Sequence, residues 1–132
     1  GSVVGELVGA LAGRVMVAHG ASIERGVIAR VTRAHFGIAL PVRSICTLAL
    51  ERRLNPNLVG SGAYRLAATR ARYGLPAYSQ HDALSDALAA GELLLAQLSR
   101  MPSALSSRAS TSAPIKAFCP PPTRAFINGD TF

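Results

Sequence analysis

The sequence predicts a helix-rich α/β fold with one clear central strand and one short strand. Apolar residues recur at helical spacing along most of the chain, whereas residues 14–19 form a short β-rich run. A β-rich run with helical segments on both sides is typical of a layered α/β fold. Of the 132 residues 49% are apolar, which is enough for a real hydrophobic core.

The first half of the chain is expected to alternate helices with the two strands. The elements expected are a helix over 3–11, a strand over 14–19, a helix from 22 to about 35 and an extended segment over 41–46. Gly13 is a plausible end for the first helix, and Gly37 for the second. Ser22 is expected to cap the second helix.

Three further helices are expected in the second half, over 47–54, over 63–73 and from Ser79 or His81 to about residue 98. Ser61 is expected to cap the middle one, and Gly74 with Pro76 ends it. The apolar side of the last helix is predicted to contain Leu84, Leu88, Leu94, Leu95 and Leu98. The helix faces formed by Val27, Ile28 and Val31 and by residues 93–95 are interpreted as core.

The composition changes after Arg100, and this divides the chain. Residues 1–100 are interpreted as one domain. Residues 101–132 are rich in Ser, Pro, Thr and Ala, and are predicted to form a disordered or loosely packed tail. The chain begins Gly-Ser, which suggests an expression scar or a cut in a longer protein.

The net charge of +7 favours a polyanionic partner such as nucleic acid, although an arginine-rich composition explains it equally well. Cys46 and Cys119 lie far apart and form no metal-type pair, so a reduced, cytoplasmic protein is expected. The apolar stretch 3–17 contains Glu6 and Arg14 and is too short and interrupted to span a membrane.

The segment His81–Ala87 carries the strongest chemical signal. Asp86 lies among small and apolar residues of the last predicted helix, and His81 precedes it by five positions. A residue just before a helix can project toward the same region as one in the second turn, so a base and a carboxylate can converge. The alternative is an ordinary helix start with a solvent-facing aspartate.

A second candidate lies at the end of the predicted strand, in residues 17–24. The strand ends in a glycine turn and leads into a helix whose first turn holds Glu24. Ligands bind at strand ends in α/β sheets. An acidic residue in a first turn also interacts well with the helix dipole, so capping alone would account for Glu24.

Together the two segments resemble the DEDDh 3′–5′ exonucleases, a ribonuclease H-like group that includes the proofreading subunit of bacterial replicative polymerase. The run His19–Glu24 is similar to the family's His-Asn-Ala-x-Phe-Asp motif, and His81–Asp86 to its His-x-x-x-x-Asp motif. Supporting similarities lie in Tyr64-Arg65-Leu66, Gly74-Leu75-Pro76 and the run from Ala87 to Leu93. The resemblance covers roughly residues 3–98.

The resemblance implies a mechanism in which four carboxylates hold two cations, Mg²⁺ or Mn²⁺, on the scissile phosphate. His81 would be the general base for the attacking water, and Asp86 and Glu24 would be metal ligands. The substrate would be the 3′ end of single-stranded DNA or RNA. The resemblance also places Tyr64 and Leu66 near the site, and Tyr64 and Arg65 are the candidate nucleic-acid contacts.

The chain departs from the family pattern in its first motif. None of its seven acidic residues forms Asp-x-Glu, so we expect a partial ribonuclease H-like fold whose N-terminal strands are missing. Gly20 replaces the usual Asn, and Glu24 the usual Asp. This chain alone is therefore expected to have little or no activity.

Two other readings remain open. A non-catalytic nucleic-acid-binding module would use basic and aromatic contacts, for which the candidates are Arg25, Tyr64, Arg65, Arg70 and Arg72. A structural or interaction fragment would use an uncovered strand edge for self-association or for another domain.

Overall fold

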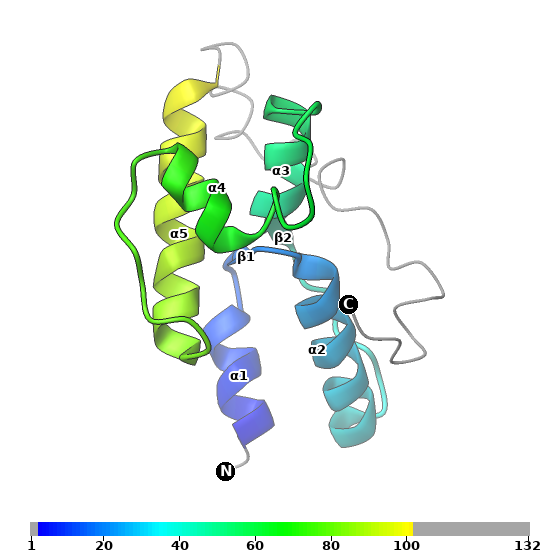
Figure 1. The fold of residues 1–132 in the computed structure, drawn as a ribbon. Coiled ribbons are helices and arrows are strands. Elements are labelled where there is room, and N and C mark those ends of the chain that lie inside the picture. Colours follow the sequence, from blue (N-terminus) through cyan, green and yellow to red (C-terminus); the bar gives the residue numbers. More distant parts are fainter. Residues whose placement is uncertain (1–2, 102–132) are drawn as a thin grey trace.

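A computed structural model describes residues 3–101 of the chain (Figure 1). The predicted order of elements is confirmed. The elements are α1 (Val3–Leu11), β1 (Met16–Ala18), α2 (Ala21–Phe36), β2 (Ser44–Cys46), α3 (Thr47–Leu54), α4 (Leu66–Arg72) and α5 (Ala83–Arg100). Within this range no helix is long and apolar enough to cross a membrane. The tail predicted for 101–132 lies outside the described residues, apart from Met101.

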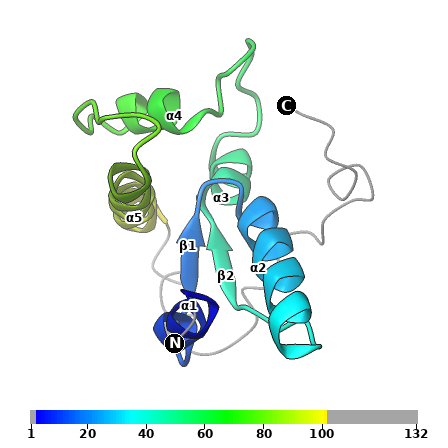
Figure 2. The ribbon, with the colours of Figure 1, turned by 90° about the horizontal axis from the view of Figure 1, so that it is seen from below.

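The sheet is built from two short parallel strands. Met16 pairs with Ser44, Val17 with Ile45 and Ala18 with Cys46. Parallel neighbours require a crossover, and α2 supplies it. Figure 2 shows β1 and β2 side by side, with α2 beyond β2 and α5 beyond β1. The fold is therefore helix-rich α/β, consistent with part of a ribonuclease H-like fold.

The described part of the chain gives β1 a strand partner on one side, so β1 lies at an edge of this sheet. The amide of Met16 donates to the Arg43 carbonyl (2.9 Å), which directs Met16 toward β2. Successive residues of a strand direct their N–H and C=O groups to opposite sides. The N–H and C=O of Val17 therefore point away from β2, toward the open edge of β1. The central position expected for this strand remains a prediction.

Three helix starts differ from the sequence predictions. Gly20, rather than Ser22, precedes α2, and it makes no side-chain cap. Arg65 precedes α4, which is shorter than the helix predicted over 63–73. Asp82 caps α5, in place of Ser79 or His81. The Asp82 carboxylate accepts a hydrogen bond from the Ser85 amide in the first turn and so fixes where α5 begins. Several neighbouring residues could have capped this helix, so the sequence did not single out Asp82.

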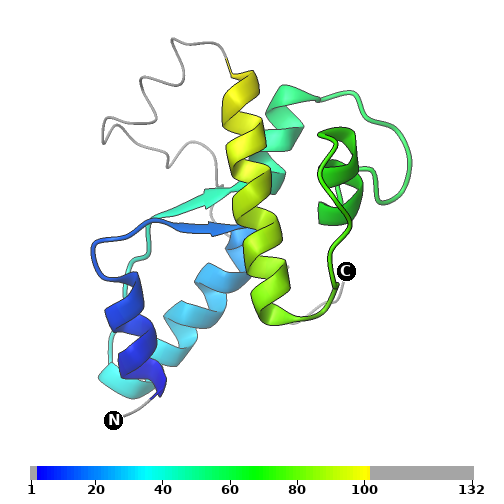
Figure 3. The same ribbon diagram turned by 90° about the vertical axis from the view of Figure 1, so that its left-hand side faces the viewer.

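The prediction for the apolar side of α5 is largely wrong. Leu84, Leu88 and Leu95 are 69%, 59% and 69% exposed. The buried face consists of Ala89, Ala90, Leu93, Leu94 and Gln97. This face packs on β1, α3 and α4, and Figure 2 and Figure 3 both show α5 next to β1. Leu93 and Leu94 share this buried face with the two alanines, whereas Leu84, Leu88 and Leu95 lie outside it.

The ends of the two strands and the start of α2 share one small core. Ala18, Ala21 and Cys46 are buried there, and Met16 and Leu48 pack against them. The Cys46 sulfur accepts a bond from the Ala49 amide and so caps α3. This core fixes the turn after β1, which forms one wall of the site described next.

Candidate active site

A cleft of about 560 Å³ lies at the C-terminal end of β1. Its polar lining comes from three parts of the chain and consists of His19, Glu24, Tyr78, Gln80, His81 and Asp86. Its apolar lining includes Met16, Val17, Leu66 and four alanines. The volume falls within the range of small-molecule sites. Residues that the sequence pattern singled out from two distant segments therefore line one cleft.

The turn between β1 and α2 brings Glu24 to the cleft. Gly20 has φ 92°, a left-handed conformation that glycine adopts without strain and asparagine tolerates better than most residues. The exchange of Asn for Gly at this position therefore preserves the turn. Glu24 lies in the first turn of α2, and its partial desolvation raises the pKa of its carboxyl above the ordinary value. A cation in the cleft would relieve that cost.

The start of α5 brings His81 and Asp86 to the opposite wall. Asp82 accepts bonds from the amide (3.0 Å) and the hydroxyl (2.6 Å) of Ser85, and these bonds lower the pKa of its carboxyl. His81 precedes this cap with φ 67°, an uncommon conformation for a residue with a side chain. Its imidazole is exposed beside the cleft, where water can reach it.

Tyr64 and Arg65, predicted near the nucleic acid, do not line the cleft. The Tyr64 hydroxyl donates to the Asn55 carbonyl (2.6 Å), and Arg52 lies over the Tyr64 ring. Arg65 is exposed at the start of α4. Leu66, the third residue of that run, does line the cleft.

Two of the arginines considered as nucleic-acid contacts are engaged inside the protein. The Arg70 side chain is 2% exposed. Arg72 donates to the Ala63 carbonyl and to side chains of Glu51 and Thr69. Arg70 and Arg72 were candidate contacts only for the alternative of a nucleic-acid-binding module, and their guanidinium groups are directed at acceptors within the protein.

His19 connects the cleft to the loop before α4. Its Nε2 lies 2.6 Å from the Tyr64 carbonyl and its Nδ1 lies 2.9 Å from the Thr47 hydroxyl. A carbonyl only accepts, so Nε2 carries the proton. The Thr47 hydroxyl has one proton and two acceptors within reach, Nδ1 of His19 and the Ala18 carbonyl at 3.4 Å. Burial lowers the pKa of His19 below its ordinary value, although the bond to Tyr64 opposes this. Burial therefore disfavours protonation of this imidazole.

This lowered pKa makes a prediction about stability. The unfolded chain takes up a proton near pH 6.5, whereas folded His19 resists it, so the free energy of unfolding should fall as the pH drops below about 6.5. His19→Gln should flatten that slope, as measured by urea unfolding between pH 7.5 and 5.5. His35→Gln, a change on the exposed end of α2, is the comparison for loss of a histidine. Equal slopes in wild type and His19→Gln would contradict the assignment.

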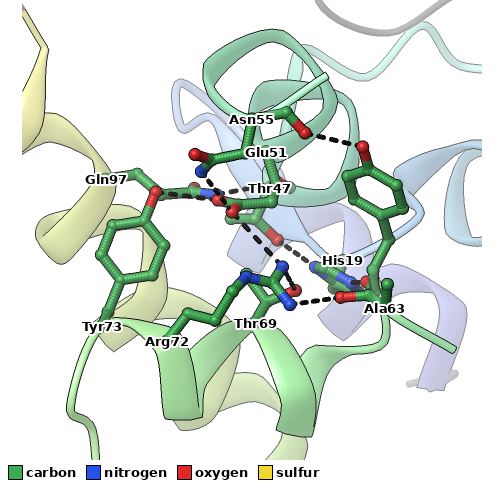
Figure 4. A network of polar contacts seen from close by, with 10 residues as sticks. His19, Thr47, Glu51, Asn55, Ala63, Thr69, Arg72, Tyr73 and Gln97 are labelled. Atoms are coloured by element: carbon green, nitrogen blue, oxygen red, sulfur yellow. Dashed lines mark hydrogen bonds and ion pairs between the residues drawn. The ribbon is translucent and has the colours of Figure 1, made fainter. Parts of the chain in front are cut away.

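A buried polar network lies behind His19 (Figure 4). Glu51 is fully buried and accepts four hydrogen bonds. Oε1 accepts from Asn55 (2.7 Å) and Arg72 (3.3 Å), and Oε2 accepts from Tyr73 (2.8 Å) and Gln97 (3.1 Å). Burial alone would raise the pKa of Glu51, but these bonds outweigh it and hold the pKa below the ordinary value. The network joins α3, α4 and α5.

The sequence analysis missed Tyr78 and Gln80, which line the cleft from the segment before α5. Tyr78 is partly buried, and desolvation together with the negative charge of Asp86 raises the pKa of its phenol. The position of Gln80 next to His81 was a usable signal. No feature of the sequence indicated Tyr78, because an isolated tyrosine before a helix is as typical of core packing as of a binding site.

The donor atoms of the cleft suit a hard divalent cation only in part. Among residues 3–101 no cluster of three or more His, Cys, Asp or Glu side chains could hold a metal ion. Mg²⁺ is commonly held by one or two carboxylates, with water and substrate phosphates completing its shell. Glu24 and Asp86 fit that mode, with phosphate oxygens supplying the remaining ligands.

Comparison with known families agrees with this arrangement. A model of the exonuclease family RNase_T matches residues 2–94, which include both cleft walls. The chain belongs to the exonuclease family. This confirms the resemblance to DEDDh-type enzymes drawn from the two motifs. No curated protein and no solved structure matches the chain.

Membership of the exonuclease family gives the cleft a chemical class. The family consists of nucleases, hydrolases that act on nucleic acid and generally use divalent metals. Within this fold the matched residues bring an imidazole and two carboxylates to the end of a strand, where α/β proteins bind ligands.

Proposed function

We propose that this chain carries the general base and two metal ligands of a two-metal 3′–5′ exonuclease. The observation that supports this most directly is the shared cleft, lined by Glu24, His81 and Asp86 from both sides. The proposed substrate is the 3′ end of a single-stranded DNA or RNA.

His81 is proposed as the general base because its imidazole is open to water beside the cleft. Glu24 and Asp86 are proposed to hold Mg²⁺ or Mn²⁺ through hard carboxylate oxygens. Such cations, when bound, polarise the scissile phosphate and stabilise the attacking and leaving oxygens. Tyr78 and Leu66 would form the apolar wall beside the terminal nucleotide.

The activity of this chain alone is expected to be weak. The family reaction uses four carboxylates, and the Asp-x-Glu pair that supplies two of them does not occur in this sequence. Glu24 also extends one methylene further than the usual aspartate. Octahedral coordination of Mg²⁺ tolerates such a shift poorly, so Mn²⁺ is the better probe.

Mn²⁺ binding tests the proposed ligands without requiring turnover. Asp86→Asn keeps the shape of the side chain but removes its charge, and should weaken Mn²⁺ affinity at least about tenfold in isothermal titration. Glu6→Gln is the matched control, because Glu6 is exposed on α1 and outside the cleft lining. Equal affinities for wild type and Asp86→Asn, or no Mn²⁺ binding by wild type, would refute the proposed metal site.

Titration with a single-stranded oligonucleotide, with and without Mn²⁺, distinguishes the exonuclease from a non-catalytic nucleic-acid-binding module. A non-catalytic module would bind single strands with strong salt dependence and without any need for metal. Exposed Arg65 is still available for such contacts, whereas Arg70 is buried. The exonuclease proposal instead expects nucleotide binding in the cleft to strengthen when Mn²⁺ is added.

A further inference from the structure

The segment between α4 and α5 carries most of one wall of the cleft. We call residues 75–82 the cleft arm. Three of its side chains line the cleft, namely Tyr78, Gln80 and His81. The arm contains no helix or strand, so its position depends on side-chain contacts with the elements around it.

Asp82 ties the end of the arm to Ser85 of α5, and Arg70 in α4 makes the contacts to the rest of it. Its Nη2 donates to the Pro76 carbonyl of the arm (2.9 Å), and its Nη1 donates to the Ala89 carbonyl of α5 (2.8 Å). Its guanidinium also lies over the ring of Tyr78, 5.2 Å from the centroid. In addition, the Arg70 carbonyl accepts from the Leu75 amide at 3.0 Å. One residue therefore joins the arm to both α4 and α5.

Burial of the Arg70 guanidinium costs desolvation free energy, which its contacts must offset. Arg70 is 2% exposed, its Nε has no hydrogen-bond partner, and its acidic neighbour Glu92 lies 3.6 Å away and is half exposed. A buried charge without a close counter-ion is destabilising unless its donors are satisfied. An apolar side chain would fill the space but could not hold two carbonyls of different segments.

The guanidinium suits this position because it is planar and has fixed donors. It binds two separate carbonyls and stacks on an aromatic ring at once. A lysine ammonium keeps the charge but offers neither a fixed fork nor a stacking plane. Arg70→Lys therefore keeps the positive charge but removes the paired carbonyl bonds and the stacking on Tyr78.

We propose that Arg70 is a positioning residue that fixes the cleft arm against α5 and so sets where His81 stands over the cleft. The proposal deepens the proposed function, because its importance rests on the role of His81. His81 follows Pro76 by five residues and adopts an uncommon left-handed conformation that the free segment would seldom populate.

Hydrogen exchange in the full chain reads the arm directly. Arg70→Lys should speed exchange of the Leu75 amide, which donates to the Arg70 carbonyl (3.0 Å), at least about tenfold relative to the amides of α5, since hydrogen-bonded loop amides exchange by local opening. Arg72→Lys is the matched control on the same helix, because Arg72 contacts Glu51, Ala63 and Thr69 but not the arm. It should change exchange in the arm and in α5 by the same factor.

A second readout follows His81 itself. In wild type, bound Mn²⁺ should broaden the imidazole signal of His81 in an NMR spectrum, and Arg70→Lys should reduce that broadening while Mn²⁺ affinity stays unchanged. A merely structural role for Arg70 would lower stability without that selective change. Should Arg70→Lys fail to fold, Tyr78→Leu removes the stacking partner, with Tyr78→Phe as the ring-preserving control.

The results separate this proposal from the proposed function. Arm exchange as slow as in wild type, or equal acceleration in the arm and α5, would overturn the role of Arg70. An absence of Mn²⁺ binding with selective loosening of the arm would overturn the metal site and leave the role of Arg70 supported.

Discussion

Replacing Glu51 by glutamine should lower the free energy of unfolding by about 3 kcal/mol. Two donors meet each carboxylate oxygen of Glu51, and a glutamine turns one oxygen into an NH₂ group that faces two of them. Arg72 also loses its counter-charge. The value lies at the low end for a broken buried pair because Arg72 is 30% exposed. It is still a large part of a typical domain's total stability.

Chemical denaturation as a function of pH provides the measurement. The folded pKa of Glu51 lies below the ordinary 4.5, so its contribution should be fully present above pH 4.5 and lost as the pH falls through the folded value. The difference between wild type and Glu51→Gln should shrink in the same window. Glu6→Gln, exposed on α1, should change stability by less than about 0.5 kcal/mol. A pH-independent difference would contradict the role given to the carboxylate.

Local patterns in the sequence were sufficient to predict most elements of the fold. The bounds of α1 and α3 are those expected, because each has a clear apolar spacing and a clear stop at Gly13 or Asn55-Pro56. Both strands lie within the predicted extended runs but are shorter, since pairing extends only where a partner residue exists.

Two features depend on tertiary contacts that periodicity does not contain. The hydrophobic pattern of α5 predicts a helix with an apolar stripe, but close approach to β1 favours the face of Ala89 and Ala90 over that of Leu84 and Leu88. Buried charged residues such as Glu51 and Arg70 are also missed, because isolated charges are typical of surfaces. Their partners are far away in the sequence.

The candidate site was predictable where a motif concentrates the chemistry. His81 and Asp86 share one helix start, and Glu24 follows the strand on which the cleft is built. Tyr64 and Leu66 were predicted near the site by resemblance, and the cleft lining includes Leu66 but not Tyr64. Tyr78 lines the cleft and lies under the guanidinium of Arg70, a contact that the sequence does not reveal.

Replacing His81 should reduce release of mononucleotides from single-stranded DNA by about 10²–10⁴-fold, the usual loss when a general base is removed. Asparagine is the suitable replacement, because it accepts the left-handed backbone of residue 81 better than alanine and has no basic nitrogen. Mn²⁺ affinity should not change, since His81 is proposed as a base and not as a ligand. His35→Asn, on exposed α2 sequence, controls for loss of a histidine.

The absolute turnover rate of the wild-type chain tests whether its activity is weak. Without the Asp-x-Glu pair, wild-type turnover should lie far below the ordinary enzymatic range of about 1–10³ s⁻¹, so the assay needs end-labelled substrate, Mn²⁺ and micromolar protein. Vigorous release that His81→Asn abolishes would contradict the expected weakness and support His81 as the base. Slow release at equal rates in wild type and His81→Asn would show that His81 is not the general base. Poor metal binding lowers both rates, but loss of a general base should still lower the rate of His81→Asn further.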